Sequence, residues 1–333
     1  QSTANRTAET HDRLCNFGPQ MQMKRLLAST RPAIVLSVVF ASTVFTKQSL
    51  RADGGVPKPD QVVSVWPNEP PAWDPPTELE RDTSDADSNQ VAGKPLIRLG
   101  FVSKPELHVY RPQHNASDTA VVICPGGSYS ILAWDLEGTE IAEWLQGIGV
   151  TAVVLKYRVP TRNSEKEWLA PVQDIQRTIS MVRSGAIEGV STTRVGTLGF
   201  SAGGNASARV AAADKRHYEL VDDSDKASAM PDFAILVYPA WLVTEEEPLK
   251  LIDDLHITKN SPPMFFAHAA DDLHSCMSSV TMFNELKQNG VPSSLHIFTR
   301  GGHGFGGRAA GSPTDAWRDL CATWMKNQGW LKE

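Results

Sequence analysis

Cysteine is scarce in this chain of 333 residues, which holds only Cys15, Cys124, Cys276 and Cys321. So few cysteines exclude the disulfide-dense scaffolds of small secreted domains. No pair has the Cys-x-x-Cys or Cys/His spacing of a zinc site, so we expect no metal and no other cofactor. One disulfide among the last three cysteines stays open, because sequence alone does not give the pairing.

Long apolar runs and a surplus of basic residues are also missing. The longest mostly apolar stretch, residues 33–45, is shorter than the roughly 20 residues that span a bilayer. Residues 1–52 hold seven of the 32 Lys/Arg and two of the 38 Asp/Glu, so the remainder has 25 basic against 36 acidic residues. An acidic body lacks the clustered positive charge that binds phosphate groups. We therefore expect no nucleic-acid partner and no stable membrane insertion of the mature chain.

Residues 1–52 have the pattern of upstream sequence followed by an export signal that starts at Met23. A positive segment precedes the apolar stretch 33–45, and Ala52 offers a cleavage point. The basic residues of that segment are Lys24, Arg25 and Arg31. The alternative is a short buried helix or a retained membrane anchor. We expect cleavage near Ala52 and a secreted or periplasmic protein.

Composition divides the rest of the chain into a lead-in segment, residues 53–105, and a catalytic domain, residues 106–333. Seven prolines fall between Pro57 and Pro76, so we expect an extended strap or a flexible arm in the lead-in segment. Beyond it, apolar strands alternate with amphipathic helices, which predicts an α/β domain with a mostly parallel sheet covered on both faces. The predicted strands are residues 106–110, 119–124, 151–157, 194–199, 233–239, 264–269 and 294–298.

The clearest chemical motif is Gly199-Phe200-Ser201-Ala202-Gly203. It follows a predicted strand and begins a helix of small residues, and small neighbours let such a turn close with the serine in a strained conformation. The hydroxyl then lies beside the free N–H groups of the helix start, which favour developing negative charge. The place of Gly-x-Ser-x-Gly between a predicted strand and a predicted helix, more than the five-residue pattern itself, predicts that Ser201 is a nucleophile.

A second glycine turn, Cys124-Pro125-Gly126-Gly127-Ser128-Tyr129, ends an earlier predicted strand. We interpret it as half of an oxyanion hole, in which the N–H groups of Gly127 and Ser128 join that of Ala202. Small residues suit this role because a substrate carbonyl oxygen must approach the backbone to ~3 Å. The alternative is a plain connection between a strand and a helix.

A serine hydroxyl is a weak nucleophile at neutral pH and needs a histidine base that a carboxylate orients. His303 lies in the glycine-rich loop 301–306, last in the chain order Ser…Asp…His, and is the predicted base. His268 and His274 are the alternatives. We expect these two to pack or to hydrogen-bond locally.

The acid is expected after a strand between the serine and the histidine, where Asp271 and Asp272 stand side by side. Aspartates in turns often cap a helix or face solvent, so one of the pair is expected to have such a role. We prefer Asp272. Asp174, Asp222 and Asp223 precede the nucleophile or lie too near its helix.

The chain resembles α/β-hydrolase-fold serine esterases of the hormone-sensitive-lipase-like, bacterial acetyl-xylan/feruloyl esterase branch, whose members are often labelled lipase/esterase or endo-xylanase. The resemblance runs from Glu106 to the C-terminus. Its matching segments are residues 125–129, 137–138, 156–160, 199–203, 271–272, 290–292 and 301–306, with Asp174 and Arg183. It implies the α/β-hydrolase fold, with Ser201 as nucleophile, Asp272 as acid and His303 as base. Leu273 and His274 depart from the small or valine residues usual after the acid.

The link between the strands 233–239 and 264–269 is short at a place where lipases insert a helical lid. We therefore expect no large lid and an open site, which suits an ester carried by a bulky carbohydrate. Aromatic faces at its mouth could stack on sugar rings. The candidates are Tyr129, Trp134, Trp241 and Phe305, with core or rim packing as the alternative.

From these residues and the resemblance we expect an exported serine carboxylesterase. Its substrate would be an acylated carbohydrate or small ester, acetyl foremost, on a plant or algal polysaccharide or oligosaccharide. One alternative is a serine peptidase of the prolyl-oligopeptidase type, which usually carries a propeller domain for which the lead-in segment leaves no room. The other is a non-catalytic carbohydrate-binding relative, which typically loses the serine or the histidine.

Overall fold

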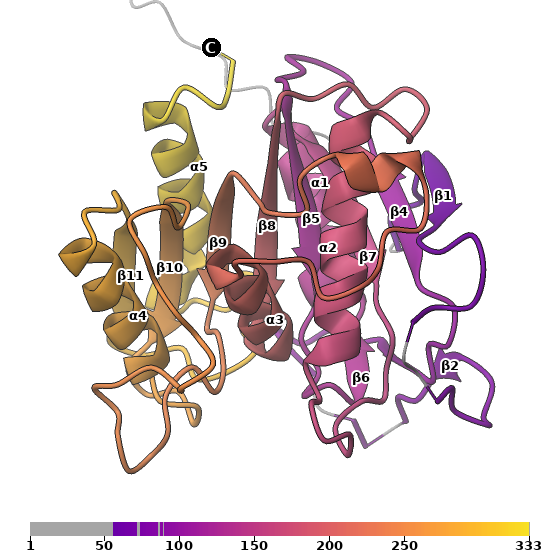
Figure 1. The fold of residues 1–333 in the computed structure, drawn as a ribbon. Coiled ribbons are helices and arrows are strands. Elements are labelled where there is room, and N and C mark those ends of the chain that lie inside the picture. The colour runs from indigo at the N-terminus through magenta and orange to yellow at the C-terminus, as the bar shows by residue number, and fades with distance from the viewer. Residues whose placement is uncertain (1–55, 72–73, 86, 89, 333) are drawn as a thin grey trace, which may run out of the picture. The chain divides into compact units, whose positions relative to one another are not determined.

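A computed structural model describes residues 56–71, 74–85, 87–88 and 90–332, so the predicted export signal and Ala52 lie outside the described residues. An eight-stranded sheet forms the centre, in the order β1-β4-β7-β5-β8-β9-β10-β11 (Figure 1). Six neighbouring strands, from β7 to β11 in that order, are parallel, while β4 is antiparallel to both β1 and β7. The strands are β1 (Gln61–Ser64), β4 (Glu106–Tyr110), β5 (Thr119–Cys124), β7 (Thr151–Lys156), β8 (Arg194–Phe200), β9 (Phe233–Val237), β10 (Met264–Ala269) and β11 (Ser294–Phe298).

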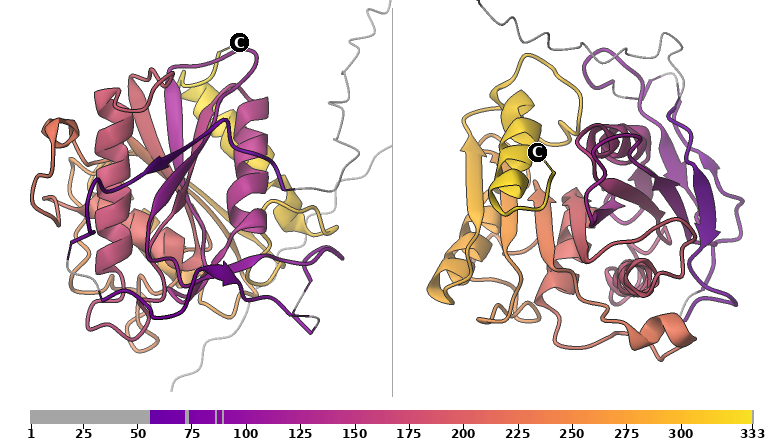
Figure 2. Two further views of the ribbon diagram at one scale, coloured as in Figure 1. Left: turned by 90° about the vertical axis from the view of Figure 1, so that its right-hand side faces the viewer. Right: turned by 90° about the horizontal axis from the view of Figure 1, so that it is seen from above.

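Helices cover both faces of this sheet. Figure 2 shows α1 and α5 on one face and α2 on the other. Because side chains alternate along a strand, Phe233 in β9 packs on Trp324 in α5, whereas Leu236 joins the cluster that contains α3 and α4 residues. The helices are α1 (Glu140–Gly147), α2 (Leu169–Ser184), α3 (Ser201–Ala212), α4 (Met277–Gln288) and α5 (Trp317–Asn327). The predicted α/β class with a mostly parallel sheet is confirmed.

The remaining elements are short. Three two- or three-residue strands form a second sheet: β2 (Arg81–Asp82), β3 (Arg98–Gly100) and β6 (Ile131–Ala133). A buried π-helix, η1 (Asp135–Thr139), precedes α1, and two 3-10 helices are η2 (Asp223–Lys226) and η3 (Pro313–Ala316).

The lead-in segment contributes to both sheets. β1 is the edge strand beside β4, and Val65 and Trp66 after it are buried. The Trp66 indole donates a hydrogen bond of 2.7 Å to Asp174 in α2, a fully buried carboxylate. The described part of the lead-in segment therefore includes an extended strap, one of the two forms expected from its proline content. Its pairing with the sheet and its contacts with the core were not predicted.

Among the described residues, no helix combines the length and the hydropathy needed to cross a membrane. The three cysteines in the described part of the chain are free thiols, and Cys124 and Cys321 are buried. No group of His, Cys, Asp and Glu side chains within the described ranges could hold a metal ion.

Candidate active site

Ser201 stands at the turn where β8 ends and α3 begins. Its φ of 50° is left-handed, a conformation that costs a non-glycine residue free energy and persists where surrounding packing fixes it. The glycines on either side are required by space. A Cβ on Gly199 would lie 2.4 Å from the Gly203 carbonyl oxygen, and one on Gly203 would lie 2.1 Å from the Cys124 carbonyl oxygen. The motif therefore folds as a tight elbow that holds the serine beside the ends of β5 and β8.

The histidine loop, residues 301–306, brings His303 to this elbow. Its Nε2 lies 2.8 Å from Ser201 Oγ, and its Nδ1 lies 2.9 and 2.8 Å from the two carboxylate oxygens of Asp272. The histidine side chain is 18% exposed and that of Asp272 is fully buried. Three side chains from separate loops thus form one hydrogen-bonded line from a carboxylate to a hydroxyl.

Of the two neighbouring aspartates, Asp272 reaches the histidine. Asp271 is exposed and accepts a hydrogen bond of 2.8 Å from the Gly302 N–H instead. Burial would raise the pKa of Asp272, but hydrogen bonds from His268 and His303, and the charge of His303, hold it well below its usual value. Asp272 is therefore ionised at neutral pH.

The other two candidate histidines surround the same carboxylate. His268, fully buried at the end of β10, places Nε2 3.2 Å from Asp272 Oδ2 and Nδ1 2.8 Å from Ser279 Oγ. The His274 N–H donates to Asp272 Oδ1 at 2.7 Å, and its ring centre lies 4.7 Å from that of His303. His303 is the histidine that bonds the Ser201 hydroxyl.

The predicted oxyanion turn, residues 124–129, lies against the serine. A Cβ on Gly126 would lie 2.8 Å from Ser201 Cβ, and one on Gly127 would lie 2.1 Å from the Ile131 carbonyl oxygen. The φ of Ser128 is 54°, which is also left-handed. Among the described residues, neither the Ser128 N–H nor the Ala202 N–H, in the first turn of α3, has a hydrogen-bond acceptor. Both can therefore donate a hydrogen bond to a substrate oxygen.

Comparison with known proteins agrees with this architecture. Residues 169–328 match the prolyl oligopeptidase family. The acetyl ester-xyloside bifunctional hydrolase from Caldicellulosiruptor lactoaceticus superposes with a TM-score of 0.63 at 25% identity, over 84% of this chain and 100% of that one. The butyrate-bound esterase Est2 of Thermogutta terrifontis gives a TM-score of 0.56 at 23% identity, over 68% and 91%. The chain has the α/β-hydrolase fold.

Two curated proteins are similar to this hydrolase. It is 28% identical to the acetylxylan esterase of Xylanibacter ruminicola over 65% of its own length, and 25% identical to endo-1,4-beta-xylanase B of Butyrivibrio fibrisolvens over 62%. These matches cover 47% and 35% of the two relatives, so the hydrolase spans about half or less of each. The sequence-based resemblance to the acetyl-xylan esterase branch is confirmed.

Three of the four aromatic residues predicted to stack on a sugar are buried. Tyr129 is fully buried and its hydroxyl donates to Asn205 Oδ1 at 2.9 Å. Trp134 and Phe305 are 8% and 7% exposed. The stacking prediction is therefore wrong for these three, because the core covers their faces. Trp241 remains half-buried beside the site, with its ring centre 5.4 Å from that of His274.

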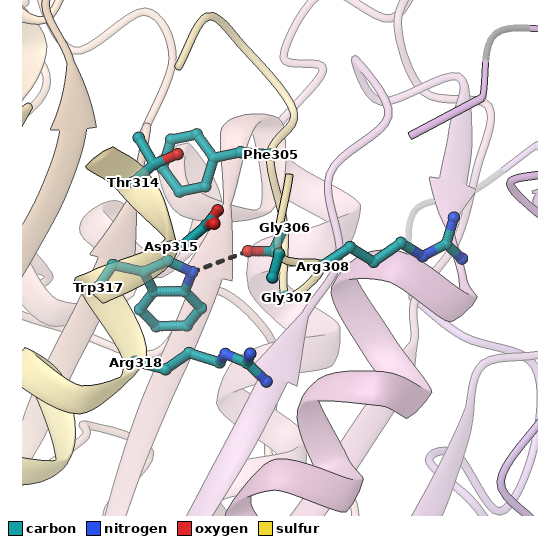
Figure 3. Close-up of a pocket in the computed structure, with 9 residues that line it drawn as sticks. Phe305, Gly306, Gly307, Arg308, Thr314, Asp315, Trp317 and Arg318 are labelled. Atoms are coloured by element: carbon teal, nitrogen blue, oxygen red, sulfur yellow. Dashed lines mark hydrogen bonds between the residues drawn. The ribbon is translucent and has the colours of Figure 1, made fainter. Parts of the chain in front are cut away.

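The segment after His303 is anchored firmly to the domain. Figure 3 shows residues 305–308 against η3 and the start of α5, where the Trp317 indole donates to the Gly306 carbonyl oxygen at 2.8 Å. The Gly306 N–H donates to the Tyr238 hydroxyl at 2.9 Å. Hydrogen bonds on both sides of this glycine restrict how far the histidine can move.

Sequence reasoning expected His268 to pack or to hydrogen-bond locally, and its ring contacts Asp272, four residues further along the chain. It gave no role to Glu137, a buried carboxylate in η1. The one available signal for Glu137 was its place in the segment 137–138 that matches the resembled family, because no local pattern distinguishes it from other acidic residues at a helix start.

Proposed function

We propose that this hydrolase is a serine carboxylesterase that removes short acyl groups, acetyl foremost, from carbohydrate. The observation that carries the proposal is the 2.8 Å contact between Ser201 Oγ and His303 Nε2, with Asp272 at the other ring nitrogen. This is the arrangement that activates a serine for acyl transfer.

In the proposed mechanism, His303 Nε2 takes the hydroxyl proton as Ser201 Oγ attacks the ester carbonyl carbon. Asp272 accepts the Nδ1–H and stabilises the imidazolium that forms. The N–H groups of Ser128 and Ala202, with that of Gly127, stabilise the oxyanion. The ester bond breaks, and the alcohol leaves with the proton from His303. Water then gives a proton to the same nitrogen as its oxygen attacks the acyl carbonyl carbon. The bond from that carbon to Ser201 Oγ breaks, His303 returns the proton to Oγ, and the carboxylic acid leaves.

Two features of the site support a carbohydrate ester. In the described link between β9 and β10 there is no helix, so no helical lid covers the triad from that segment. An open hollow of about 830 Å³ is lined largely by polar residues, namely Asp74, Thr161, Asn163, Ser164, Glu165 and Lys166. It borders the oxyanion turn, because the Thr161 N–H donates to the Tyr129 carbonyl oxygen at 2.7 Å. A polar hollow that borders the oxyanion turn suits a hydroxyl-rich substrate.

The names of the relatives support the same substrate class. Of the two curated relatives, one is named an acetylxylan esterase and the other an endo-1,4-beta-xylanase, and the solved structure that the chain covers in full is named an acetyl ester-xyloside bifunctional hydrolase. Acetylated xylan or xylo-oligosaccharide is therefore the first substrate to test.

Peptide hydrolysis is the second candidate, because residues 169–328 match the prolyl oligopeptidase family. The triad would serve either reaction. The two differ in the leaving group, since an amine must be protonated before it departs, whereas an alcohol is the easier leaving group.

The deciding experiment compares both substrate classes on the purified chain. We expect release of acetate from acetylated xylan and hydrolysis of p-nitrophenyl acetate, with negligible cleavage of a proline-containing peptide p-nitroanilide. A kcat/KM for the peptide above that for both esters would reverse the assignment. A Ser201→Ala chain is the control for each substrate.

We also propose that the mature protein is exported. The support is the basic and apolar pattern of residues 23–52. N-terminal sequencing of the protein recovered outside the cytoplasm of a bacterial host should begin at Asp53. Recovery of the uncleaved chain in the cytoplasm alone would contradict the proposal.

A further inference from the structure

One buried carboxylate outside the triad connects the segments that carry the proposed chemistry. Glu137 is 4% exposed. Its Oε2 accepts the Gly126 N–H at 2.6 Å and its Oε1 accepts the Tyr238 hydroxyl at 2.8 Å. The Tyr238 oxygen in turn accepts the Gly306 N–H at 2.9 Å. The oxyanion turn and the histidine loop are therefore tied to one carboxylate, directly and through one tyrosine.

This network lies against the reacting groups. A Cβ on Gly126 would lie 2.8 Å from both Glu137 Oε2 and Ser201 Cβ, so only the glycine backbone separates the carboxylate from the nucleophile. The Tyr238 ring centre is 4.9 Å from that of His303. Tyr238 has a left-handed φ of 39°, a strained conformation that the fold maintains where the hydroxyl meets Glu137.

The direction of the hydrogen bonds indicates the charge of this carboxylate. The Tyr238 oxygen accepts a hydrogen bond from the Gly306 N–H, so the Tyr238 hydroxyl donates its own proton to Glu137. Burial and the Glu137 charge raise the pKa of Tyr238, which keeps that proton on the hydroxyl. The pKa of Glu137 is raised, because burial outweighs the opposing effects of the bonds from Tyr238 and Gly126 and of the charge of His303. Both Glu137 oxygens receive a proton donor, as an ionised carboxylate requires.

We propose that Glu137 is a positioning residue of the esterase. It fixes the oxyanion turn and the histidine loop relative to Ser201, and its negative charge favours the protonated histidine that forms during acyl transfer. The proposal rests on the proposed function, in which acyl transfer protonates His303.

Other charged or titratable groups also face His303. Asp272 contacts Nδ1, the half-buried His274 lies on the ring, Asp271 holds the neighbouring Gly302 N–H, and Arg162 lies 4.5 Å over the Trp241 ring that His274 contacts. Asp271 and Arg162 are exposed, so solvent screens them. Burial, then the charge of His303, lowers the pKa of His274, which leaves that ring neutral. Of the carboxylates named around His303, Asp272 and Glu137 are thus the two that solvent screens least.

The test is Glu137→Gln in the full chain, assayed on p-nitrophenyl acetate from pH 5 to 9. Glutamine keeps the shape and removes the charge. We expect kcat to fall about tenfold with KM within about threefold, since the loss affects the transition state. Because a neighbouring negative charge favours protonation, its removal should shift the acid limb of the kcat/KM profile down by about half a pH unit. Tyr238→Phe, which retains the charge and cuts the link, should lower kcat with a smaller shift of the limb.

The matched control is Asp135→Asn in the same π-helix. Its carboxylate accepts from the Ile97 N–H and from Arg308, on the other side of the network. We expect this variant to leave the pH of the acid limb unchanged, even if it unfolds at a lower temperature than the wild type. Unchanged kcat and limb in Glu137→Gln would overturn the proposal, and so would a loss of kcat that matches the unfolded fraction with the limb unmoved.

Two further measurements cover the cases in which Glu137→Gln does not fold or the proposed function is wrong. If Glu137→Gln does not fold, an unchanged kcat and limb in Tyr238→Phe reject it. A fluorophosphonate probe should label Ser201 in the wild type and more slowly in Glu137→Gln. Equal labelling rates reject this inference alone, whereas an unlabelled wild type rejects the proposed function.

Discussion

Replacing Asp272 by Asn is the most informative perturbation of the proposed triad. The fully buried carboxylate accepts from His303 Nδ1, from His268 Nε2 and from the His274 N–H. An amide retains one acceptor oxygen and presents an N–H₂ donor to the remaining positions, so the His303 tautomer that receives the Ser201 proton is no longer enforced. In a comparable triad this change lowers kcat by about 10⁴-fold, and we expect a loss of that order here.

The same substitution should lower stability in a pH-dependent way. The pKa of Asp272 is depressed in the folded protein, so its contribution is present above the unfolded value of about 3.9 and is lost as the pH falls through the lower folded value. The variant should therefore unfold at lower urea concentration at pH 7, by about 1–3 kcal/mol in the free energy of unfolding. The difference from the wild type should shrink below about pH 3.9.

Steady-state kinetics on p-nitrophenyl acetate and urea unfolding measure these two effects. Asp271→Asn is the matched control, because Asp271 is exposed and holds only the Gly302 N–H among the contacts described. It should cost at most several-fold in kcat. An Asp272→Asn enzyme within tenfold of the wild type, or a larger loss in Asp271→Asn, would refute the assignment of the acid.

Three other predictions concern the base, the oxyanion turn and the site mouth. The kcat/KM should fall as the pH drops from 8 to 5, since the base must be neutral to accept the Ser201 proton; a flat profile over this range contradicts the prediction. Gly127→Ala should abolish turnover or folding, because the new Cβ would lie 2.1 Å from the Ile131 carbonyl oxygen at a φ of 133°. Circular dichroism distinguishes loss of folding from loss of turnover, and a folded variant with wild-type kcat would contradict the prediction. Trp241→Ala should raise KM for acetylated xylo-oligosaccharide about tenfold while leaving p-nitrophenyl acetate within twofold; equal effects on both substrates would remove Trp241 from carbohydrate binding.

The sequence was sufficient for the parts of the fold that depend on local pattern. Strands such as β5 and β9 are continuous apolar runs, and Gly-x-Ser-x-Gly between a strand and a helix has few other uses. The structure brings Ser201, Asp272 and His303 together as the sequence predicted, and their catalytic roles remain proposals. The preference for Asp272 over Asp271 came partly from the resembled family, because two adjacent aspartates look alike in sequence.

What the sequence did not predict depends on packing between distant segments. Glu137 and Tyr238 are about a hundred residues apart, and only the folded sheet places the hydroxyl 2.8 Å from the carboxylate. The prediction that aromatic rings stack on sugar failed because burial of a large apolar ring near a loop contributes more free energy to folding than its exposure would. Tyr129 and Phe305 are both buried in this way.

Peptide mapping after reaction with a fluorophosphonate shows whether Ser201 is the nucleophile. We expect one stoichiometric adduct on Ser201 in the folded wild type, and none in a folded Ser201→Ala chain. A folded wild type that stays unmodified, or an adduct that persists in the alanine variant, would contradict it.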